Sequence, residues 1–328
     1  MSREKLEFSV VITTYNRLDL LPIAIESALE QTLAPKEVIV VDDCSTRDET
    51  EAYMRELSAR DPRVKYIRNG TNLHHSRSVN KGVEAATGNW IKFLDDDDYL
   101  APTCLEVMAD GIAAAQAKTS DEIAMCSVQA YQEYLDGKIF HCTKLPVPVA
   151  GVSLSFGTED AGYLVPQDDV HYNMLTERLP FGTPVQVACS KKAFEAAGGW
   201  NHAFSGSCDD IEFWIRAASE GAAVMLHAPV AHRTHGDDNI SDKLTPLERC
   251  QTNTTIKHKI YERISLKYAK SLPPMERIQG ELEVHWTLVS LKRCLKQKKI
   301  DDAKDLLARV ASAPSHCRSY LSSRLKRA

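Results

Sequence analysis

The sequence of 328 residues lacks several features that mark particular classes of protein. It has no run of about 18 apolar residues, the length that a helix needs to cross a bilayer, so an integral membrane protein is not expected. The N-terminus, MSREKLEF, is charged and leads directly into a β-branched run, so no signal peptide is predicted. The nine cysteines are scattered and form no CxxC pair, which is typical of reduced, mostly buried thiols and favours a cytoplasmic location.

The composition is otherwise that of a globular protein with ample material for a core. Hydrophobic residues make up 43% of the chain and charged residues 26%. The net charge of −5 conceals an asymmetry: residues 1–240 hold 21 basic and 36 acidic side chains, whereas residues 241–328 hold 19 and 9. An acidic N-terminal region and a basic C-terminal region suggest two parts of the chain with different partners.

Apolar, β-branched runs alternate with amphipathic helical patterns at intervals of about 25 residues, which predicts an α/β fold with a mostly parallel sheet. Strands are expected at residues 8–13, 37–41, 64–67, 90–94, 123–134, 186–189 and 222–227. Residues 137–184 show no periodicity and are interpreted as an active-site insertion. Beyond residue 240 the pattern is helical, with a hairpin over 282–310, so two domains are predicted, 1–240 and 241–328.

Acidic residues follow the predicted strands where open α/β sheets bind ligands. Asp95–Asp98 come directly after a buried strand, and four adjacent carboxylates repel one another unless a cation lies among them. Mg²⁺ and Mn²⁺ prefer such oxygen ligands. A solvated acidic turn before the next helix is the alternative interpretation.

Two further polar runs follow strands. Residues 13–17, TTYNR, offer hydroxyls, an aromatic face and a cation, and Asp42-Asp43 offer acceptors for a base or a ribose hydroxyl. A polar turn with a helix cap is the favoured interpretation of TTYNR considered alone, whereas capping explains one acid or hydroxyl of the DDCST run but not the whole run.

Asp209-Asp210 open a predicted helix, whose dipole favours the ionised form of a carboxylate and so suits a general base. An ordinary acidic first turn is the alternative. His232 and His235 have a spacing that suggests zinc, but no cysteine pair completes such a site, so a single histidine beside an aspartate-bound metal is favoured.

Taken in order, the runs VVITTYNR, VDDCST, NKGVEAATGNWIKFLDDDDYLAP, GGW, DDIEFWIR and HRTH closely resemble the family 2 glycosyltransferases of GT-A fold over about residues 7–240. The resemblance implies a GT-A (Rossmann-like) mixed, mostly parallel sheet flanked by helices. It also implies an inverting transfer of a sugar from a nucleotide-diphosphate sugar, often UDP- or dTDP-linked, in polysaccharide or glycoconjugate synthesis. The acceptor would be a carbohydrate or a lipid-linked saccharide.

On the donor side, the resemblance assigns roles to five residues. Thr13, Tyr15 and Arg17 match the first nucleotide-binding loop of the family. Asp42 or Asp43 matches its base- and ribose-binding acids.

The resemblance places Asp95, Asp96 and Asp97 in the DxD position. Asp95 would hold the ribose or a metal-bound water, Asp97 would ligate Mg²⁺ or Mn²⁺, and Asp98 is a neighbouring candidate ligand. His235 matches a position near the diphosphate, where it could complete the metal site.

On the acceptor side, Asp210 matches the catalytic base of the family's ED motif, with Asp209 in place of the usual glutamate. Trp200 and Trp214 would line the acceptor. The chain departs from the family in having His74 where a glycine is frequent and Val79 where an arginine precedes the asparagine. These departures leave the donor open.

Two other functions remain as alternatives. A nucleotidyltransferase needs a glycine-rich, basic loop after the first strand, and TTYNR has no glycine. A non-catalytic sugar-nucleotide-binding protein would not need both acidic clusters. The basic region 241–328 is expected either to be a solvated helical face or to make peripheral contact with an anionic membrane; a nucleic-acid partner is not expected, because aromatics are not interleaved with its charges.

Overall fold

The computed structural model describes residues 6–134, 137–141, 147–156, 159–176, 178–179, 181–204, 209–235, 248, 252, 254–262, 274–296 and 300–311. The chain forms two compact units, one of residues 1–170 and 181–237 and the other of residues 171–180 and 238–328. The predicted boundary between residues 240 and 241 lies outside the described residues.

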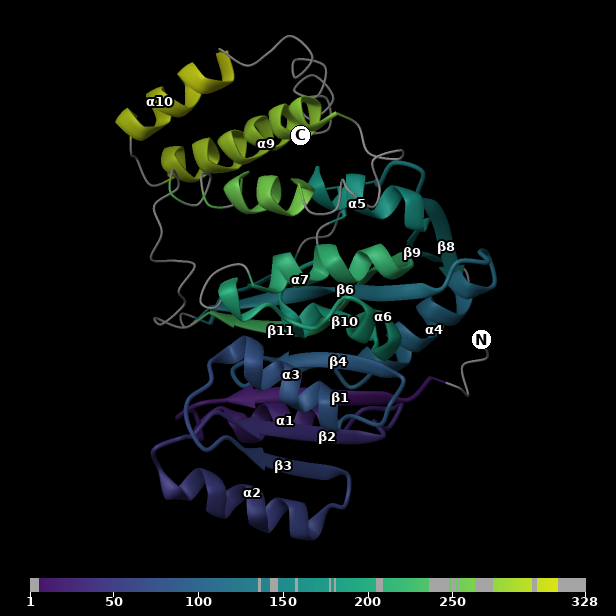
Figure 1. Cartoon of the computed structure of the whole chain (residues 1–328), viewed down its shortest axis with the longest axis vertical. Helices are drawn as coiled ribbons and strands as arrows, with labels where there is room; N and C mark the ends of the chain where they lie inside the picture. Colours follow the sequence, from purple (N-terminus) through teal and green to yellow (C-terminus); the bar gives the residue numbers. More distant parts are fainter. Residues whose placement is uncertain are drawn as a thin grey trace. The chain divides into compact units, whose positions relative to one another are not determined.

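The first unit is built on a mixed sheet of eleven strands among the described residues, with the order β3-β2-β1-β4-β10-β6-β11-β9-β8 (Figure 1). Four neighbouring strands are parallel: β1 (Phe8–Thr14), β2 (Glu37–Asp42), β3 (Val64–Arg68) and β4 (Trp90–Asp95). The mixed half contains β10 (Val187–Ser190), β6 (Ile123–Tyr134), β11 (Ala222–His235), β9 (Glu159–Val165) and β8 (Val152–Phe156). Two short strands lie off this path: β5 (Tyr99–Leu100) pairs with β11, and β7 (Ile139–His141) pairs with β6.

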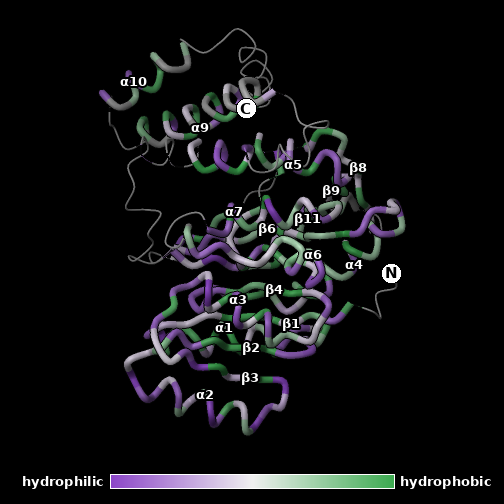
Figure 2. Tube along the Cα trace, in the orientation of Figure 1, coloured by the Kyte–Doolittle hydropathy of each residue, from purple (hydrophilic) through white to green (hydrophobic). Residues whose placement is uncertain are grey.

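Helices cover both faces of the parallel strands, which explains why β1 and β2 are buried along almost their whole length rather than at alternate residues (Figure 2). Val10 and Ile12 belong to one apolar cluster with helices α1 and α4, whereas Val11 points to α3. A Cβ on Gly82 of α3 would lie 2.5 Å from Val11 Cγ1, so glycine allows this helix to approach the sheet closely. The helices of this unit are α1 (Leu21–Leu29), α2 (Asp48–Arg60), α3 (His75–Ala85), α4 (Cys104–Gln116), α6 (Lys191–Ala196) and α7 (Asp209–Ala217).

The central strand β4 contains a fully buried lysine. The ammonium group of Lys92 donates to the carbonyls of Val185 (2.7 Å), Pro184 (3.1 Å) and Phe93. Burial lowers the pKa of Lys92 to about 8. The three carbonyls satisfy the amine and fix β4, which leads to Asp95, against the 3₁₀ turn Pro184–Gln186.

The described parts of residues 137–184, in which the sequence showed no periodicity, contain a β8–β9 hairpin, β7 and helix α5 (Gln167–Leu175). One prediction about the strands was wrong. The strand predicted to end at residue 227 continues to His235. The register of β11 against β6 shifts on either side of Pro229, because proline has no N–H to donate to the ladder. Pro229 therefore interrupts the strand pattern in the sequence, although the strand itself continues.

In the described part of the second unit, α9 (Met275–Lys296) and α10 (Ile300–Ala311) pack together through Cys294, Ala303 and Leu306. The unit also includes residues 171–180, which the sequence placed in the insertion. There Tyr172 Oη donates to Glu281 Oε2 of α9 at 3.2 Å. None of the helices in the described part of the chain is long and apolar enough to cross a membrane.

Candidate active site

The acids that follow β2 and β4 lie at the same edge of the sheet. Thr14 of β1 is in register with Asp42, and Thr13 is in register with Asp95. Parallel pairing therefore brings the TTYNR loop between the two acidic runs, at the carboxyl edge where open α/β sheets bind ligands.

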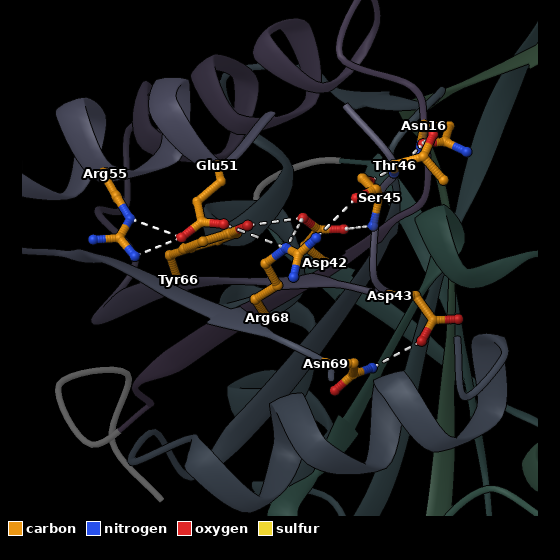
Figure 3. Close-up of polar contacts among 10 residues, drawn as sticks. All are labelled: Asn16, Asp42, Asp43, Ser45, Thr46, Glu51, Arg55, Tyr66, Arg68 and Asn69. Carbon is orange, nitrogen blue, oxygen red and sulfur yellow. Dashed lines mark hydrogen bonds and ion pairs between the residues drawn. The ribbon is translucent and has the colours of Figure 1, made fainter. Parts of the chain in front are cut away.

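Asp42 is fully buried, and hydrogen bonds engage both of its carboxylate oxygens (Figure 3). Oδ1 accepts from the Ser45 amide at 2.8 Å, and Oδ2 accepts from the Tyr66 hydroxyl at 2.7 Å. Arg68 lies 3.7 Å from Oδ2. Desolvation and the Asp42 carboxylate raise the pKa of Tyr66, which keeps the phenol protonated as a donor. Asp42 therefore anchors the loop after β2.

The neighbouring acid, Asp43, is bonded differently. Its Oδ1 accepts from the Asn69 amide (2.8 Å) and from the Leu73 backbone N–H (2.7 Å), and these are its only side-chain hydrogen bonds among the described residues. Oδ2 thus has capacity to accept from a ligand N–H or O–H.

The loop after β1 is joined to the loop after β2. Asn16, in the left-handed region (φ 57°), donates its backbone N–H to Ser45 Oγ at 2.9 Å and accepts the Thr46 N–H at 2.8 Å. This clamp leaves the preceding residue, Tyr15, 43% exposed. Its ring is therefore available for stacking.

Asp95, Asp97 and Asp98 form the one group of three metal-capable side chains among the described residues, with ligand oxygens all within 4.8 Å of one another. Burial, together with repulsion between these carboxylates, raises the pKa of Asp97 and of Asp98. Asp96 points elsewhere and is nearly buried; burial raises its pKa to about 6.

Arg17 supplies positive charge to this cluster. Its Nη1 lies 2.6 Å from Asp97 Oδ2 and 3.2 Å from Asp96 Oδ1. The side chain is 41% exposed, so it has room to turn toward a bound phosphate.

Asp209 and Asp210 occupy the first turn of α7, and a histidine connects them to the cluster on β4. His75 Nδ1 lies 3.3 Å from Asp209 Oδ2, and its Nε2 lies 3.5 Å from Asp95 Oδ1. Burial opposes the charged imidazolium, but hydrogen bonds to Asp209 and Asp95 outweigh it and raise the pKa of His75 to about 10. The sequence had not singled out His75; its position beside His74 was the available signal.

The two acids of α7 differ in their pKa. Burial would raise the pKa of Asp209, but hydrogen bonds from His75 and Ser76 hold it below the usual value. Burial, with the Asp209 charge beside it, raises the pKa of Asp210 to about 6. Asp210 is therefore the more basic carboxylate, as a general base requires.

This arrangement can be compared with known proteins. Residues 9–139 match the family model described as Glycosyl transferase family 2. Over this segment the chain is similar to that family.

Proteins similar to this chain include the succinoglycan biosynthesis protein ExoO of Rhizobium meliloti, 40% identical over 112 residues. They also include a GalNAc(5)-diNAcBac-PP-undecaprenol beta-1,3-glucosyltransferase of Campylobacter jejuni, 38% identical over 104 residues. The matched segments cover 34% and 31% of this chain, and only 31% and 33% of the two relatives.

A solved structure shows the same fold over nearly the whole chain. S. aureus TarS 1-349, in complex with UDP-GlcNAc, superposes with a TM-score of 0.60 at 15% identity, covering 96% of this chain and 84% of that one. The GT-A α/β fold expected from the sequence is thereby confirmed.

Three expected site residues lie outside the group of metal-capable carboxylates, although the ring of Trp200 packs edge-on against that of His75 at 5.0 Å. Trp200 and Trp214 are 2% and 0% exposed and pack with Phe93 and Phe213 beneath α7, so neither presents a ring face to an acceptor. Asn80 fixes the backbone of Trp200 with two hydrogen bonds of 2.8 and 2.9 Å. These tryptophans therefore support α7 from the core.

His235 lies at the end of β11 and is held by β6. Its ring stacks on Tyr134 at 4.4 Å, and its Nε2 is 2.8 Å from Gln132 Oε1. His235 is not a member of the metal-capable group, although the preceding residue, Thr234, donates its N–H to Asp98 Oδ1 at 2.8 Å.

Proposed function

We propose that the chain is an inverting glycosyltransferase that moves a sugar from a nucleotide-diphosphate sugar, UDP- or dTDP-linked, to an acceptor hydroxyl. One observation carries this proposal: three carboxylates converge at the end of β4, and His75 links them to a separate pair of acids that opens α7. An inverting displacement needs these two things, a site that neutralises the leaving group and a base for the acceptor.

The loops after β1 and β2 would bind the nucleotide. Tyr15 would stack on the base, and Asp43 would accept a hydrogen bond from a base N–H or a ribose hydroxyl. Arg17 lies between these loops and the cluster on β4, where it can reach the diphosphate. Asp42 would act only by holding the loop.

The carboxylate group fits a divalent cation. Its donors are all oxygen atoms, the ligands that Mg²⁺ and Mn²⁺ prefer, and the raised pKa values of Asp97 and Asp98 indicate that the negative charges are underneutralised. Asp95, Asp97 and Asp98 would hold the ion. When bound, such an ion supplies electrostatic stabilisation to a departing diphosphate.

Asp210 would take the acceptor proton. The acceptor oxygen forms a bond to the anomeric carbon as the bond from that carbon to the diphosphate oxygen breaks on the opposite face, which inverts the configuration. With a pKa of about 6, Asp210 is ionised at neutral pH and is a stronger base than an ordinary aspartate. No covalent intermediate on the protein is required.

His75 would position both sets of acids. A protonated imidazole between Asp95 and Asp209 neutralises part of their charge and holds α7 at a set distance from β4. His75 engages Asp209 and would leave the adjacent Asp210 available to the acceptor, while burial and the charge of Asp209 keep the pKa of Asp210 raised.

The relatives support a carbohydrate acceptor, because one acts in succinoglycan biosynthesis and another is named as a glucosyltransferase acting on an undecaprenol-linked saccharide. A lipid-linked acceptor would place the enzyme at a membrane surface, and the 19 basic residues in 241–328 would favour contact with anionic lipid. Sedimentation with liposomes tests this contact: the protein should sediment with anionic liposomes and not with neutral ones. Equal sedimentation with both would contradict it.

The reaction is tested by incubating the protein with a panel of UDP-, dTDP- and GDP-sugars in Mg²⁺ or Mn²⁺ and measuring release of the nucleoside diphosphate. At least one donor should be hydrolysed slowly without acceptor, and EDTA and the variant Asp97→Ala should abolish the release. Release of pyrophosphate from a nucleoside triphosphate and a sugar phosphate, with no turnover of any nucleotide sugar, would indicate a nucleotidyltransferase instead.

A further inference from the structure

Aromatic rings gather at the tip of the sheet, where β5, β11, β6 and β7 pair side by side. Tyr99, His232, Tyr131 and His141 are cross-strand partners and form one row, with successive ring centroids 4.3, 5.0 and 5.0 Å apart. Glu133 lies on the same face and bonds Tyr99 Oη (2.5 Å) and His232 Nδ1 (2.6 Å). This first row is therefore internally satisfied.

A second group of rings lies on the other face of the same strands, because its members alternate with those of the first row. Tyr134 stacks on His235 at 4.4 Å, and Phe140 meets Tyr134 nearly edge-on, at 5.9 Å and 79°. Unlike the first row, this group is open: Tyr134 is 44% exposed and Phe140 is 56% exposed.

Such exposure is uncommon in this molecule. Among the described residues, the exposed aromatic side chains are Tyr15, Tyr134 and Phe140. Tyr15 belongs to the proposed nucleotide site, so the other two need a separate explanation. Large exposed rings held rigidly in place are typical of a binding surface.

The group is continuous with the carboxylate cluster. The N–H of Thr234 donates to Asp98 Oδ1 at 2.8 Å, and the next residue, His235, carries the stacked Tyr134. An acceptor must reach the sugar of a donor held at that cluster, so a molecule lying on these rings has one end close to the proposed site of transfer.

The chemistry of the surface identifies its ligand. A sugar ring has an apolar C–H face that stacks on an aromatic ring, and hydroxyls around its rim that need donors and acceptors. Gln132, bonded to His235 on the same face, supplies polar atoms beside the rings. A phosphate group would need cations here, and the nucleotide base already has Tyr15.

We propose that Tyr134 and Phe140, at the β6–β7 hairpin, form a subsite that binds a saccharide unit of the acceptor. This proposal rests on the proposed glycosyltransferase function. It names acceptor-binding residues in place of Trp200 and Trp214, whose rings are buried.

The test measures saccharide binding by saturation-transfer NMR and calorimetry, using cellotetraose, chitotetraose, maltotetraose and laminaritetraose as probes. Proteins to compare are the wild type, Tyr134→Ala, Phe140→Ala and Phe140→Trp. Ile139→Ala is the matched control, because Ile139 is 58% exposed and precedes Phe140 on β7 but is not aromatic. Thermal unfolding of each variant checks that it is folded.

At least one probe should bind the wild type, and each alanine variant at an aromatic position should bind it about tenfold more weakly, the loss expected for a stacked ring. Phe140→Trp should retain binding, and Ile139→Ala should match the wild type. The absence of binding by every probe, or equal binding by Phe140→Ala, would overturn the proposal.

Calorimetry with UDP and with dTDP, each with Mn²⁺, on the same proteins separates this proposal from the proposed function. The nucleotide that binds the wild type should bind all the variants equally. If saccharide binding depends on the rings but neither nucleotide binds the wild type, the saccharide site stands and the proposed function fails. If either nucleotide binds and no saccharide does, the subsite fails and the proposed function stands.

Discussion

The acids after β2 and those after β4 begin from the same sequence pattern, a run of aspartates after a buried parallel strand, yet the structure treats them differently. Asp42 and Asp43 are tied into a network with Ser45, Tyr66 and Asn69 (Figure 3). At the end of β4, Asp95, Asp97 and Asp98 face one another, and burial together with mutual repulsion raises the pKa of Asp97 and Asp98. In the proposed function, the first arrangement would bind the nucleoside and the second would hold a cation.

The difference shows how an acidic protein can bind an anionic substrate. Hydrogen bonds hold the acids at β2 in place, so they would recognise the neutral base and sugar of a nucleotide. At β4 several carboxylates lie close together, and a bound divalent ion would reverse the local charge. Arg17 adds a cation beside this second group, on Asp96 and Asp97.

The largest expected effect is on the proton transfer near β4. Asp210→Asn removes the base and should reduce the transfer rate about 10²–10⁴-fold, because general base catalysis contributes about that much. UDP affinity should be unchanged. Asp48→Asn, the same substitution at an exposed helix start, is the control. A rate within a few-fold of wild type in Asp210→Asn would refute the assignment of the base.

The pH dependence of transfer should follow the same carboxylate. Asp210 has a pKa of about 6, and an acid is ionised above its pKa, so the basic form is present at pH 7 and is lost as the pH falls. Lowering the pH from 7 to 5 should reduce kcat about tenfold. UDP binding over the same range is the control, and a kcat that stays flat down to pH 5 would show that another group is the base.

The two acids after β2 can be separated by substitution. Asp43→Asn should weaken UDP binding about tenfold with little change in stability, because an amide cannot offer the same oxygen to a ligand N–H. Asp42→Asn should instead lower the free energy of unfolding by about 1–3 kcal/mol, because it disrupts the buried bonds to Ser45 and Tyr66. Calorimetry and urea unfolding measure both effects; identical behaviour of the two variants would contradict the distinction.

The smallest expected effect belongs to the nucleotide base. Tyr15→Ala should weaken UDP binding about fivefold through loss of stacking, and Tyr15→Phe should retain wild-type affinity. An equal loss in Tyr15→Phe would mean that the hydroxyl, rather than the ring, makes the contact.

Much of this site could be predicted from the sequence, because parallel strands must deliver their C-terminal residues to one edge. That rule alone places the runs at Asp42 and Asp95 together, and the family resemblance adds Asp209. Neither the rule for parallel strands nor the family resemblance predicts that Asp42 holds a loop, because this role depends on a hydrogen bond from Tyr66 on a neighbouring strand. Nor could they find His75, whose role arises only when α3 and α7 meet beside β4.

The acceptor side was harder to predict for physical reasons. Pro229 interrupts the pattern of β11, so the strand that carries His235 was expected to end early. Trp200 was expected at the surface because tryptophan suits sugar binding, but the aromatic cluster around Phe93 buries it. Exposure is decided by tertiary packing, which residue type alone does not reveal.

The central claim is that the carboxylates at the end of β4 hold a divalent ion on which nucleotide binding depends. It is tested most directly by calorimetric titration of UDP into the wild type and into Asp97→Ala, each in Mn²⁺ and in EDTA. Wild-type protein should bind UDP tightly only in Mn²⁺, and Asp97→Ala should bind it weakly in both. Equal affinity of the wild type with and without the metal would contradict the claim.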